Sequence, residues 1–345
     1  MRQLLAAAAR FLRDRIGWHR VGIALSLCII AAAGVTLFHI MRDVDVDKVL
    51  AVVAATPTRR IAAAAGLVAV AYVTLTFYDL FALRTIGQGT VPYRVAAFAA
   101  FASYSIGHNI GATVFTGGAI RFRIYSAWGL SVVDVAKMAF VTGLTFWLGN
   151  AFVLGLGVAY DPQAASAIDQ LPPAANRVLA FALLFVIVGY LAWLTAAPRV
   201  IGRAQWRVAL PNAQLTLVQI LIGLFDLGSS GLAMYVLLPQ TAGVDFVTVL
   251  VTFVLSTLLG FASHAPGGLG VFDASMLVAL WQFDKEALVA ALLLFRLLYY
   301  VVPFSLALAV LGTREVWINV AAALAARRPP PDTPCRGSRR AGPPE

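Results

Sequence analysis

Two glycine-rich segments, one in each half of the chain, contain most of the side chains that could bind a ligand. The first, residues 108–123, includes His108, Gly117, Gly118, Arg121 and Arg123. The second, residues 263–273, includes His264, Gly267, Gly268 and Asp273. Interrupted helices in corresponding places of two halves are typical of a transporter's binding site. The pattern therefore predicts a polar site between two broken helices.

The chemistry of both segments suits an anionic substrate. Glycine allows the backbone to approach a ligand closely, and a helix that starts after an interruption directs free N–H groups at that point. The guanidinium groups of Arg121 and Arg123 add forked donors that match phosphate. The alternative is that the glycines only allow tight helix packing, as small residues do in membranes.

Ionisable side chains within apolar sequence are further candidates, because a charge in hydrocarbon is costly without a partner. They are Asp79, Lys137, Asp226 and Arg296. Arg296 lies in the apolar run 292–303 and requires a carboxylate, a phosphate or a carbonyl group. A structural pair with Asp273 or Asp226 and a contact with substrate remain equal alternatives, and one network could combine them.

The spacing of Asp273 and Arg296 favours a direct interaction. They lie at similar distances on either side of residue 285. If residues 271–283 and 288–311 form an antiparallel hairpin, both side chains lie at similar depth. We predict that they pair directly, or share a water or a lipid phosphate.

The histidines His108 and His264 could move protons or bind a metal. No carboxylate-rich cluster or zinc-type Cys–His spacing accompanies them in the sequence, so a hydrogen-bonded structural role is favoured. Nucleophile-elbow, metalloprotease, dinucleotide-binding and Walker motifs are also missing. We therefore expect no catalytic residue, no metal and no cofactor, and an ATP-driven pump is excluded for this chain alone.

Composition indicates that a membrane positions these residues. Of the 345 residues, 61% are hydrophobic and 12% are charged, against about 25% charged in a soluble domain. The sequence predicts an all-α polytopic membrane protein with about eight transmembrane helices and two broken or re-entrant helices. The eight expected spans are 21–41, 61–82, 95–115, 133–158, 177–197, 213–238, 244–263 and 287–311.

The chain divides into three expected regions. Residues 1–20 form a basic amphipathic segment, residues 21–312 a flippase-like transmembrane domain, and residues 313–345 a disordered tail rich in Pro and Arg. The two cysteines, Cys28 and Cys335, lie in the first span and in the tail, so no structural disulfide is expected.

Loop charges predict the orientation of the chain in the membrane. The net charge of +10 is interpreted as charge that orients the protein in the membrane, and no nucleic-acid partner is expected. The protein is expected in the inner membrane, with both basic ends in the cytoplasm. If each glycine-rich segment crosses the membrane, Arg121, Arg123 and the loop 199–207 also lie inside. The two segments then cross in opposite directions, as in an inverted repeat. The basic loop 42–60 does not fit this arrangement.

Several motifs give the chain a family resemblance. They are residues 116–125 (TGGAIRFRIY) followed by 129–131 (GLS), residues 266–272 (PGGLGVF) and residues 296–300 (RLLYY). From residue 20 to 312 the chain resembles the transmembrane family named for lysylphosphatidylglycerol synthase. That family includes the flippase portion of the bacterial multiple-peptide-resistance factor and stand-alone proteins, some associated with hopanoid biosynthesis.

The resemblance implies movement of an unspecified lipid between leaflets, with two departures. Asp273 stands where the family commonly has Glu, which keeps the charge but shortens its reach. The soluble aminoacyl-transfer domain of bifunctional members does not follow the membrane region, so we expect no lysyl transfer.

The leading hypothesis is a bacterial inner-membrane lipid flippase, and its expected partners are membrane lipids with an anionic head group and a separate lipid-synthesis enzyme. One alternative is a membrane enzyme or accessory that modifies lipid head groups, with His108, His264 or Asp273 as acid or base. Another is a secondary transporter of a small soluble anion. A chemically changed lipid would indicate the head-group enzyme, and uptake of the soluble anion would indicate the secondary transporter; a flippase would show neither.

Overall fold

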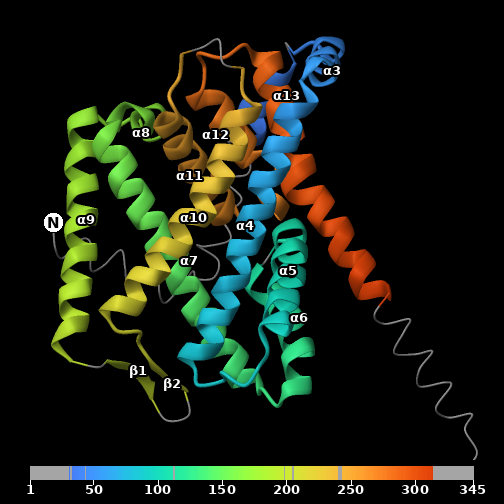
Figure 1. Ribbon diagram of the computed structural model, residues 1–345. Helices are drawn as coiled ribbons and strands as arrows, with labels where there is room; N and C mark the ends of the chain where they lie inside the picture. The colour runs from blue at the N-terminus through green and yellow to red at the C-terminus, as the bar shows by residue number, and fades with distance from the viewer. Residues whose placement is uncertain are drawn as a thin grey trace, which may run out of the picture. The chain divides into compact units, whose positions relative to one another are not determined.

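The computed structural model describes residues 31, 33–42, 44–111, 113–197, 199–203, 206–239 and 243–313. The expected amphipathic segment 1–20, most of the first span and the tail beyond residue 313 lie outside these residues. Within the described part the chain is helical apart from one two-stranded hairpin. The predicted all-α class of a polytopic membrane protein is confirmed (Figure 1).

Six helices are long and apolar enough to cross a membrane, among the described residues. They are α4 (Thr58–Thr85), α7 (Val132–Tyr160), α9 (Pro173–Ala196), α10 (Ala213–Leu237), α11 (Phe246–Ser263) and the helix Lys285–Thr313. The last of these contains α13 (Lys285–Arg296) and a π-helical turn, η4 (Leu297–Val301). All six correspond to predicted spans.

The predicted span 95–115 is not one continuous helix. It is divided into α5 (Tyr93–Ile110) and α6 (Thr113–Tyr125), followed by η2 (Ser126–Trp128). Gly111 lies between α5 and α6 with φ of 81°, which favours glycine. Since a positive φ takes the chain out of the helix, α5 ends there.

Shorter elements connect the long helices. They are α3 (Val46–Ala55), α8 (Pro162–Asp169), the strands β1 (Val200–Arg203) and β2 (Trp206–Ala209), η3 (Pro266–Gly268) and α12 (Val271–Ala279). The antiparallel pairing of β1 with β2 runs from Val200 opposite Ala209 to Arg203 opposite Trp206. This hairpin occupies the loop predicted at 199–207.

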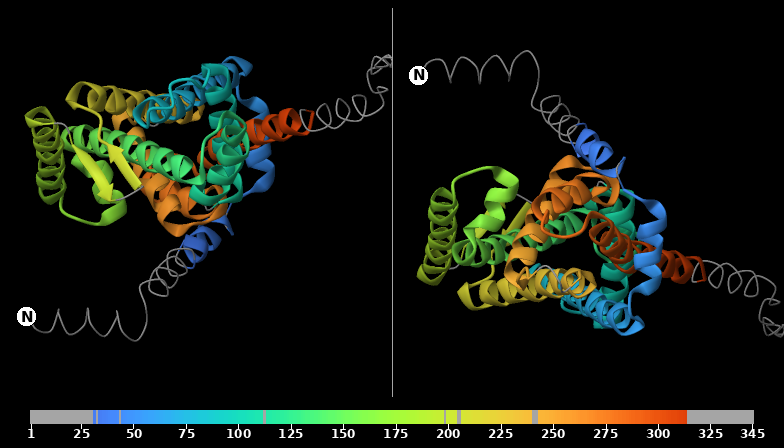
Figure 2. Two further views of the ribbon diagram at one scale, coloured as in Figure 1. Left: turned by 90° about the horizontal axis from the view of Figure 1, so that it is seen from below. Right: turned by 90° about the horizontal axis from the view of Figure 1, so that it is seen from above.

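Close helix packing brings α10 against both α4 and α7 (Figures 1 and 2). The contact with α7 depends on two facing glycines. A Cβ atom on Gly149 would lie 2.6 Å from the Cα of Gly223, so neither position has room for a side chain. Small residues let helix backbones approach in this way in membranes.

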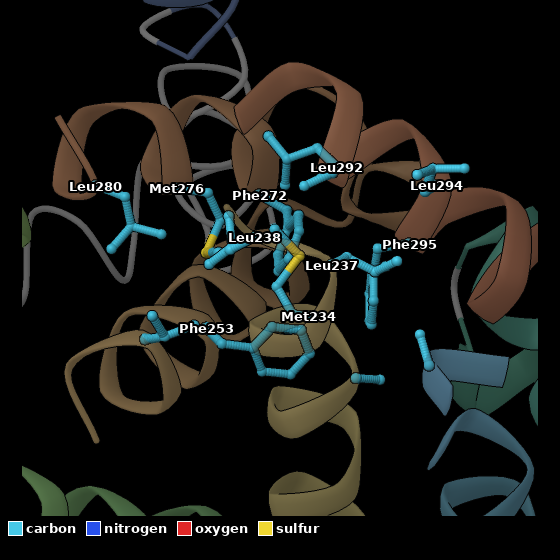
Figure 3. Close-up of a cluster of buried hydrophobic side chains, with 14 of the residues drawn as sticks. Met234, Leu237, Leu238, Phe253, Phe272, Met276, Leu280, Leu292, Leu294 and Phe295 are labelled. Atoms are coloured by element: carbon cyan, nitrogen blue, oxygen red, sulfur yellow. The ribbon is translucent and has the colours of Figure 1, made fainter. Parts of the chain in front are cut away.

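An apolar cluster fixes α12 and α13 against α10 and α11 (Figure 3). Its aromatic centre consists of Phe253, Phe272 and Phe295, with ring centroids 5.5 Å apart for Phe253 and Phe272 and 5.4 Å apart for Phe253 and Phe295. Asp273 and Arg296 directly follow two of these rings in the sequence. The buried rings therefore set the positions of the two charged side chains.

Candidate functional site

The two glycine-rich segments touch through their backbones. A Cβ atom on Gly111 would lie 3.3 Å from the Cα of Pro266 and 3.5 Å from the carbonyl oxygen of His264. The two segments therefore approach each other, as expected for a site between two broken helices. The second segment is a true interruption, because Gly267 and Gly268 have φ of 59° and 61°.

The first interruption differs from the prediction. Gly117 and Gly118 lie inside α6, and the helix break is at Gly111 instead. A Cβ on Gly117 would lie 3.4 Å from both the Ser103 carbonyl oxygen and Arg121 Nη1, whereas nothing lies within 4 Å of Gly118. Gly117 therefore allows close packing of α6 on α5, which is the alternative reading of this motif.

Arg121 forms a buried bidentate pair with Asp79 of α4. Its Nε donates to the two carboxylate oxygens at 3.1 and 2.9 Å, and its Nη2 donates to Oδ1 at 2.8 Å. Tyr125 Oη donates to Asp79 Oδ2 at 2.9 Å. The Asp79 and Arg121 side chains are 0% and 7% exposed. In contrast to the expectation of a phosphate partner, the fork of Arg121 is occupied by Asp79.

Arg296 pairs with Asp273, as predicted. Arg296 Nε donates to Asp273 Oδ1 at 2.8 Å, and Nη2 donates to Oδ2 at 2.6 Å. The third nitrogen, Nη1, donates to the carbonyl oxygen of Gly267 at 3.2 Å. Asp273 Oδ2 also accepts from the backbone N–H of Gly270 at 3.0 Å, which caps the start of α12. One carboxylate thus joins the second helix break to α13.

The Arg296 pair is more open than the Arg121 pair. The Arg296 and Asp273 side chains are 14% and 15% exposed. Phosphate and carboxylate both match the guanidinium fork, so an arriving phosphate could compete with Asp273 for Arg296.

The two histidines occupy different environments. His108 lies between aromatic rings, 5.6 Å from Tyr104 and stacked at 6.3 Å on Tyr299. Its Nδ1 is buried and has no hydrogen-bond partner among the described residues. His264 is exposed at the end of α11, with its Nδ1 3.0 Å from the Ala262 carbonyl oxygen. His108 is therefore part of the buried site, and His264 lies at its surface.

A chain of rings connects the two Arg–Asp pairs. The Arg121 guanidinium lies 4.7 Å from the ring of Tyr104, and the Arg296 guanidinium lies 5.4 Å from that of Tyr300. Between Tyr104 and Tyr300 the ring contacts continue through His108 and Tyr299, whose ring centroid is 5.1 Å from that of Tyr300. Arg123 is exposed on α6 and is not among the residues of these ring contacts.

The π-helical turn η4 contributes backbone acceptors beside this ring chain. The carbonyl oxygen of Tyr299 accepts from Tyr72 Oη at 2.9 Å, and that of Tyr300 accepts from Asn109 Nδ2 at 3.2 Å. A π-helical turn frees carbonyl groups from the α-helical pattern, and such turns are frequent at functional sites. Asn109 and Tyr72 thus attach α5 and α4 to the turn that follows Arg296.

Sequence reasoning found only part of this site. Asp79 was a candidate as an ionisable residue in a span, but nothing local in the sequence identifies Arg121 as its partner. Tyr72 and Asn109 carried no signal that separates them from other polar residues in helices. Within the described residues no group of three or more His, Cys, Asp and Glu side chains could hold a metal ion.

Comparison with known proteins gives relatives over most of the chain. The uncharacterized protein slr0712 of Synechocystis is 31% identical over 258 residues, which cover 74% of this chain and 80% of the relative. The inner membrane protein YbhN of Escherichia coli is 28% identical over 297 residues, which cover 84% of this chain and 91% of YbhN. A scan against models of protein families finds no match.

A shorter similarity involves a much longer protein. The phosphatidylglycerol lysyltransferase of Staphylococcus haemolyticus is 40% identical over 74 residues, which cover 21% of this chain but only 9% of that protein. The similarity is therefore confined to a small part of the lysyltransferase.

Proposed function

Because this chain belongs to the membrane-protein family of slr0712 and YbhN, which is related to the transmembrane region of lysylphosphatidylglycerol synthase, we propose that it moves a lipid between the two leaflets of a bacterial inner membrane. Relatives of this kind support a lipid-related membrane function. The proposal adds that the protein moves the lipid and does not change it chemically.

The contact between the two interrupted segments supports this proposal most strongly. Gly111 and Pro266 lie against each other. The largely buried Arg296–Asp273 pair bonds to the second interruption through Gly267, and the buried Arg121–Asp79 pair joins α6, which follows the first interruption, to α4. Irregular backbone at membrane depth is tolerated only where protein or a water-filled cavity covers it. A charged head group meets a large barrier in hydrocarbon, and these polar groups would lower that barrier.

Arg296 is the proposed contact for the lipid phosphate. Its fork is held by Asp273, and its remaining nitrogen bonds to the carbonyl oxygen of Gly267. A phosphate that replaces Asp273 would find the same bidentate geometry. Asp273 would then hold Arg296 in position between transport events, so the guanidinium would always have an anionic partner.

Reconstitution tests the proposed function. The full chain is placed in vesicles that contain a fluorescent phosphatidylglycerol or phosphatidylethanolamine, and an impermeant reductant reports the lipid in the outer leaflet. We expect faster exchange than in protein-free vesicles, and mass spectrometry should show the lipid unchanged. A chemically modified lipid without faster exchange would favour a head-group enzyme, and no exchange with either lipid would count against a flippase of these phospholipids.

A further inference from the structure

We propose that Asp226, in the middle of α10, is a proton-binding site inside the membrane, and that proton binding there is coupled to lipid movement. The coupling, but not the proton site, depends on the function proposed above. Asp226 is 6% exposed. Neither of the Arg–Asp pairs includes it.

The hydrogen bonding of Asp226 is incomplete. Tyr78 Oη donates to Asp226 Oδ2 at 3.2 Å, while Oδ1 is buried and without a hydrogen-bond partner among the described residues. No described Lys, Arg or His nitrogen lies within salt-bridge distance of this carboxylate. A lone carboxylate charge in hydrocarbon is costly, and binding a proton removes that charge.

The other two membrane-buried carboxylates provide a contrast within the same protein. Asp79 and Asp273 each receive two or more hydrogen bonds from a guanidinium group. Their negative charge is therefore balanced by a positive charge. Asp226 has only a neutral phenol, so it is the carboxylate of the three for which a proton is the suitable partner.

The groups that face Asp226 are hydroxyls. Its charge interacts with the side chains of four tyrosines, which are Tyr72, Tyr78, Tyr104 and Tyr299. Of the other helices that pack on α10, α11 has no Asp, Glu, Lys, Arg or His, and neither does α7 over residues 138–159. Arg296 of α13 is bound to Asp273, and the titratable groups of α9 are Arg177 and Tyr190.

Ser230 provides an acceptor that a protonated Asp226 would need. It lies four residues further along α10, hence on the same face of the helix. Its Oγ is buried, and the Tyr299 hydroxyl lies within hydrogen-bonding reach of it. A protonated carboxyl group is a donor, and a hydroxyl oxygen accepts. A proton on Asp226 Oδ1, which has no hydrogen-bond partner among the described residues, would turn that atom into a donor to a hydroxyl oxygen in the same helix.

A proton fits this place better than a metal ion. Metal cations of the sodium or calcium type take several carboxylate or carbonyl oxygens as ligands. None of the contacts of the described residues joins a second carboxylate to Asp226, and its hydrogen-bond partner Tyr78 is a donor. The described residues also contain no group of three His, Cys, Asp and Glu side chains able to hold a metal.

Ring contacts connect Asp226 to the Arg121–Asp79 pair. The ring of Tyr78 lies 6.1 Å from that of Tyr104, and the Tyr104 ring lies 4.7 Å from the Arg121 guanidinium. A proton on Asp226 weakens the acceptor of Tyr78. Because Tyr78 contacts Tyr104, this change reaches the Arg121–Asp79 pair that anchors α6.

Infrared spectroscopy tests the proton site independently of transport. Spectra of the full chain in lipid bilayers are compared in acid and alkaline buffer. We expect a protonated-carboxyl band that disappears in alkaline buffer and is absent from Asp226→Asn. The same band in wild type and in Asp226→Asn would overturn the proposal. If Asp226→Asn does not fold, Asp226→Glu is used instead and should shift the band. An unshifted band in Asp226→Glu would also overturn the proposal.

The coupling is tested in vesicles with an imposed pH gradient. Wild-type lipid exchange should change when the gradient is reversed, and exchange by Asp226→Glu should still respond. Exchange by Asp226→Asn should not respond. A response to a sodium gradient at constant pH, or an equal response in Asp226→Asn, would contradict the coupling. A titrating band in a protein that moves no lipid would leave the proton site standing and refute the proposed function.

Discussion

Asp273 and Arg296, which are 23 residues apart, form a bidentate ion pair because each directly follows a phenylalanine of the same aromatic cluster. The rings of Phe272 and Phe295 lie 6.3 Å apart and nearly parallel. Their packing brings α12 and α13 together at one depth. The apolar cluster thus determines the geometry of the charged pair, and the pair closes the second helix break through Gly267 and Gly270.

This pair is expected to respond asymmetrically to single and double substitutions. Arg296→Ala leaves Asp273 as an uncompensated charge and should destabilise the protein by about 3 to 5 kcal/mol, as for other buried pairs that lose one partner. Asp273→Ala combined with Arg296→Ala should recover most of this loss, apart from about 1 kcal/mol for the lost helix cap. Thermal unfolding of the four proteins in detergent gives the coupling. Additive single effects would show that the pair has no coupling energy.

Gly111 is expected to be sensitive to any side chain. Gly111→Ala requires a residue with a Cβ at φ of 81°, which costs about 1 to 3 kcal/mol, and pushes the new atom toward Pro266. Gly118→Ala is the matched control, because Gly118 is helical with open space around it, and alanine there should be neutral or stabilising by up to about 1 kcal/mol. Unfolding temperatures in detergent measure both. Equal effects would contradict the assignment of the break to Gly111.

The contact between α7 and α10 provides a third test. Gly223→Ala would place a Cβ 2.5 Å from the Cα of Gly149 and should cost about 1 to 3 kcal/mol through overpacking. Gly143→Ala is the control. Gly143 lies in α7, as Gly149 does, but a Cβ there meets nothing within 4 Å, so the substitution should be tolerated. The comparison uses unfolding temperature and the fraction of monodisperse protein after purification. Tolerance of Gly223→Ala would show that α10 packs less closely on α7.

The orientation in the membrane is predicted from charge. The hairpin of β1 and β2 carries Arg207 and is preceded by Arg199, and both should lie in the cytoplasm with the C-terminus. A reporter enzyme that works only in the cytoplasm should be active when it is fused after residue 326, and one that works only in the periplasm should be inactive there. A cysteine introduced at Val200, which is 59% exposed, should resist an impermeant thiol reagent added outside spheroplasts. Labelling from outside would contradict this orientation.

The sequence predicted those features that depend on local composition. The long apolar runs became helices with nearly the expected ends, as for α10 and α11. Their starts are marked by Asn212 and Asp245, whose side chains accept backbone N–H groups of the first helical turn. Capping residues next to apolar runs are readable without tertiary information. The Asp273–Arg296 pair was predictable for a similar reason, because a hairpin fixes its geometry.

Features that depend on distant contacts were not predicted. The first interruption was expected at Gly117–Gly118, but it lies at Gly111, whose contact with the distant Pro266 is not visible in the local sequence. Arg121 was expected to face a phosphate, and its actual partner is Asp79. This partner lies 42 residues away in another helix, so the local sequence does not identify it. The hairpin of β1 and β2 was read as a loop because its strands have only four residues each.

The rate of lipid exchange by Arg296 variants in vesicles tests the central claim most directly. Wild type, Arg296→Ala, Arg296→Lys and the control Arg94→Ala, at an exposed position in the first turn of α5, are reconstituted in equal amounts with fluorescent phosphatidylglycerol. We predict that Arg94→Ala matches wild type, that Arg296→Ala loses exchange, and that Arg296→Lys is only partly active because an ammonium group lacks the planar fork. Wild-type exchange in folded Arg296→Ala would contradict the proposal that Arg296 binds the lipid phosphate during translocation.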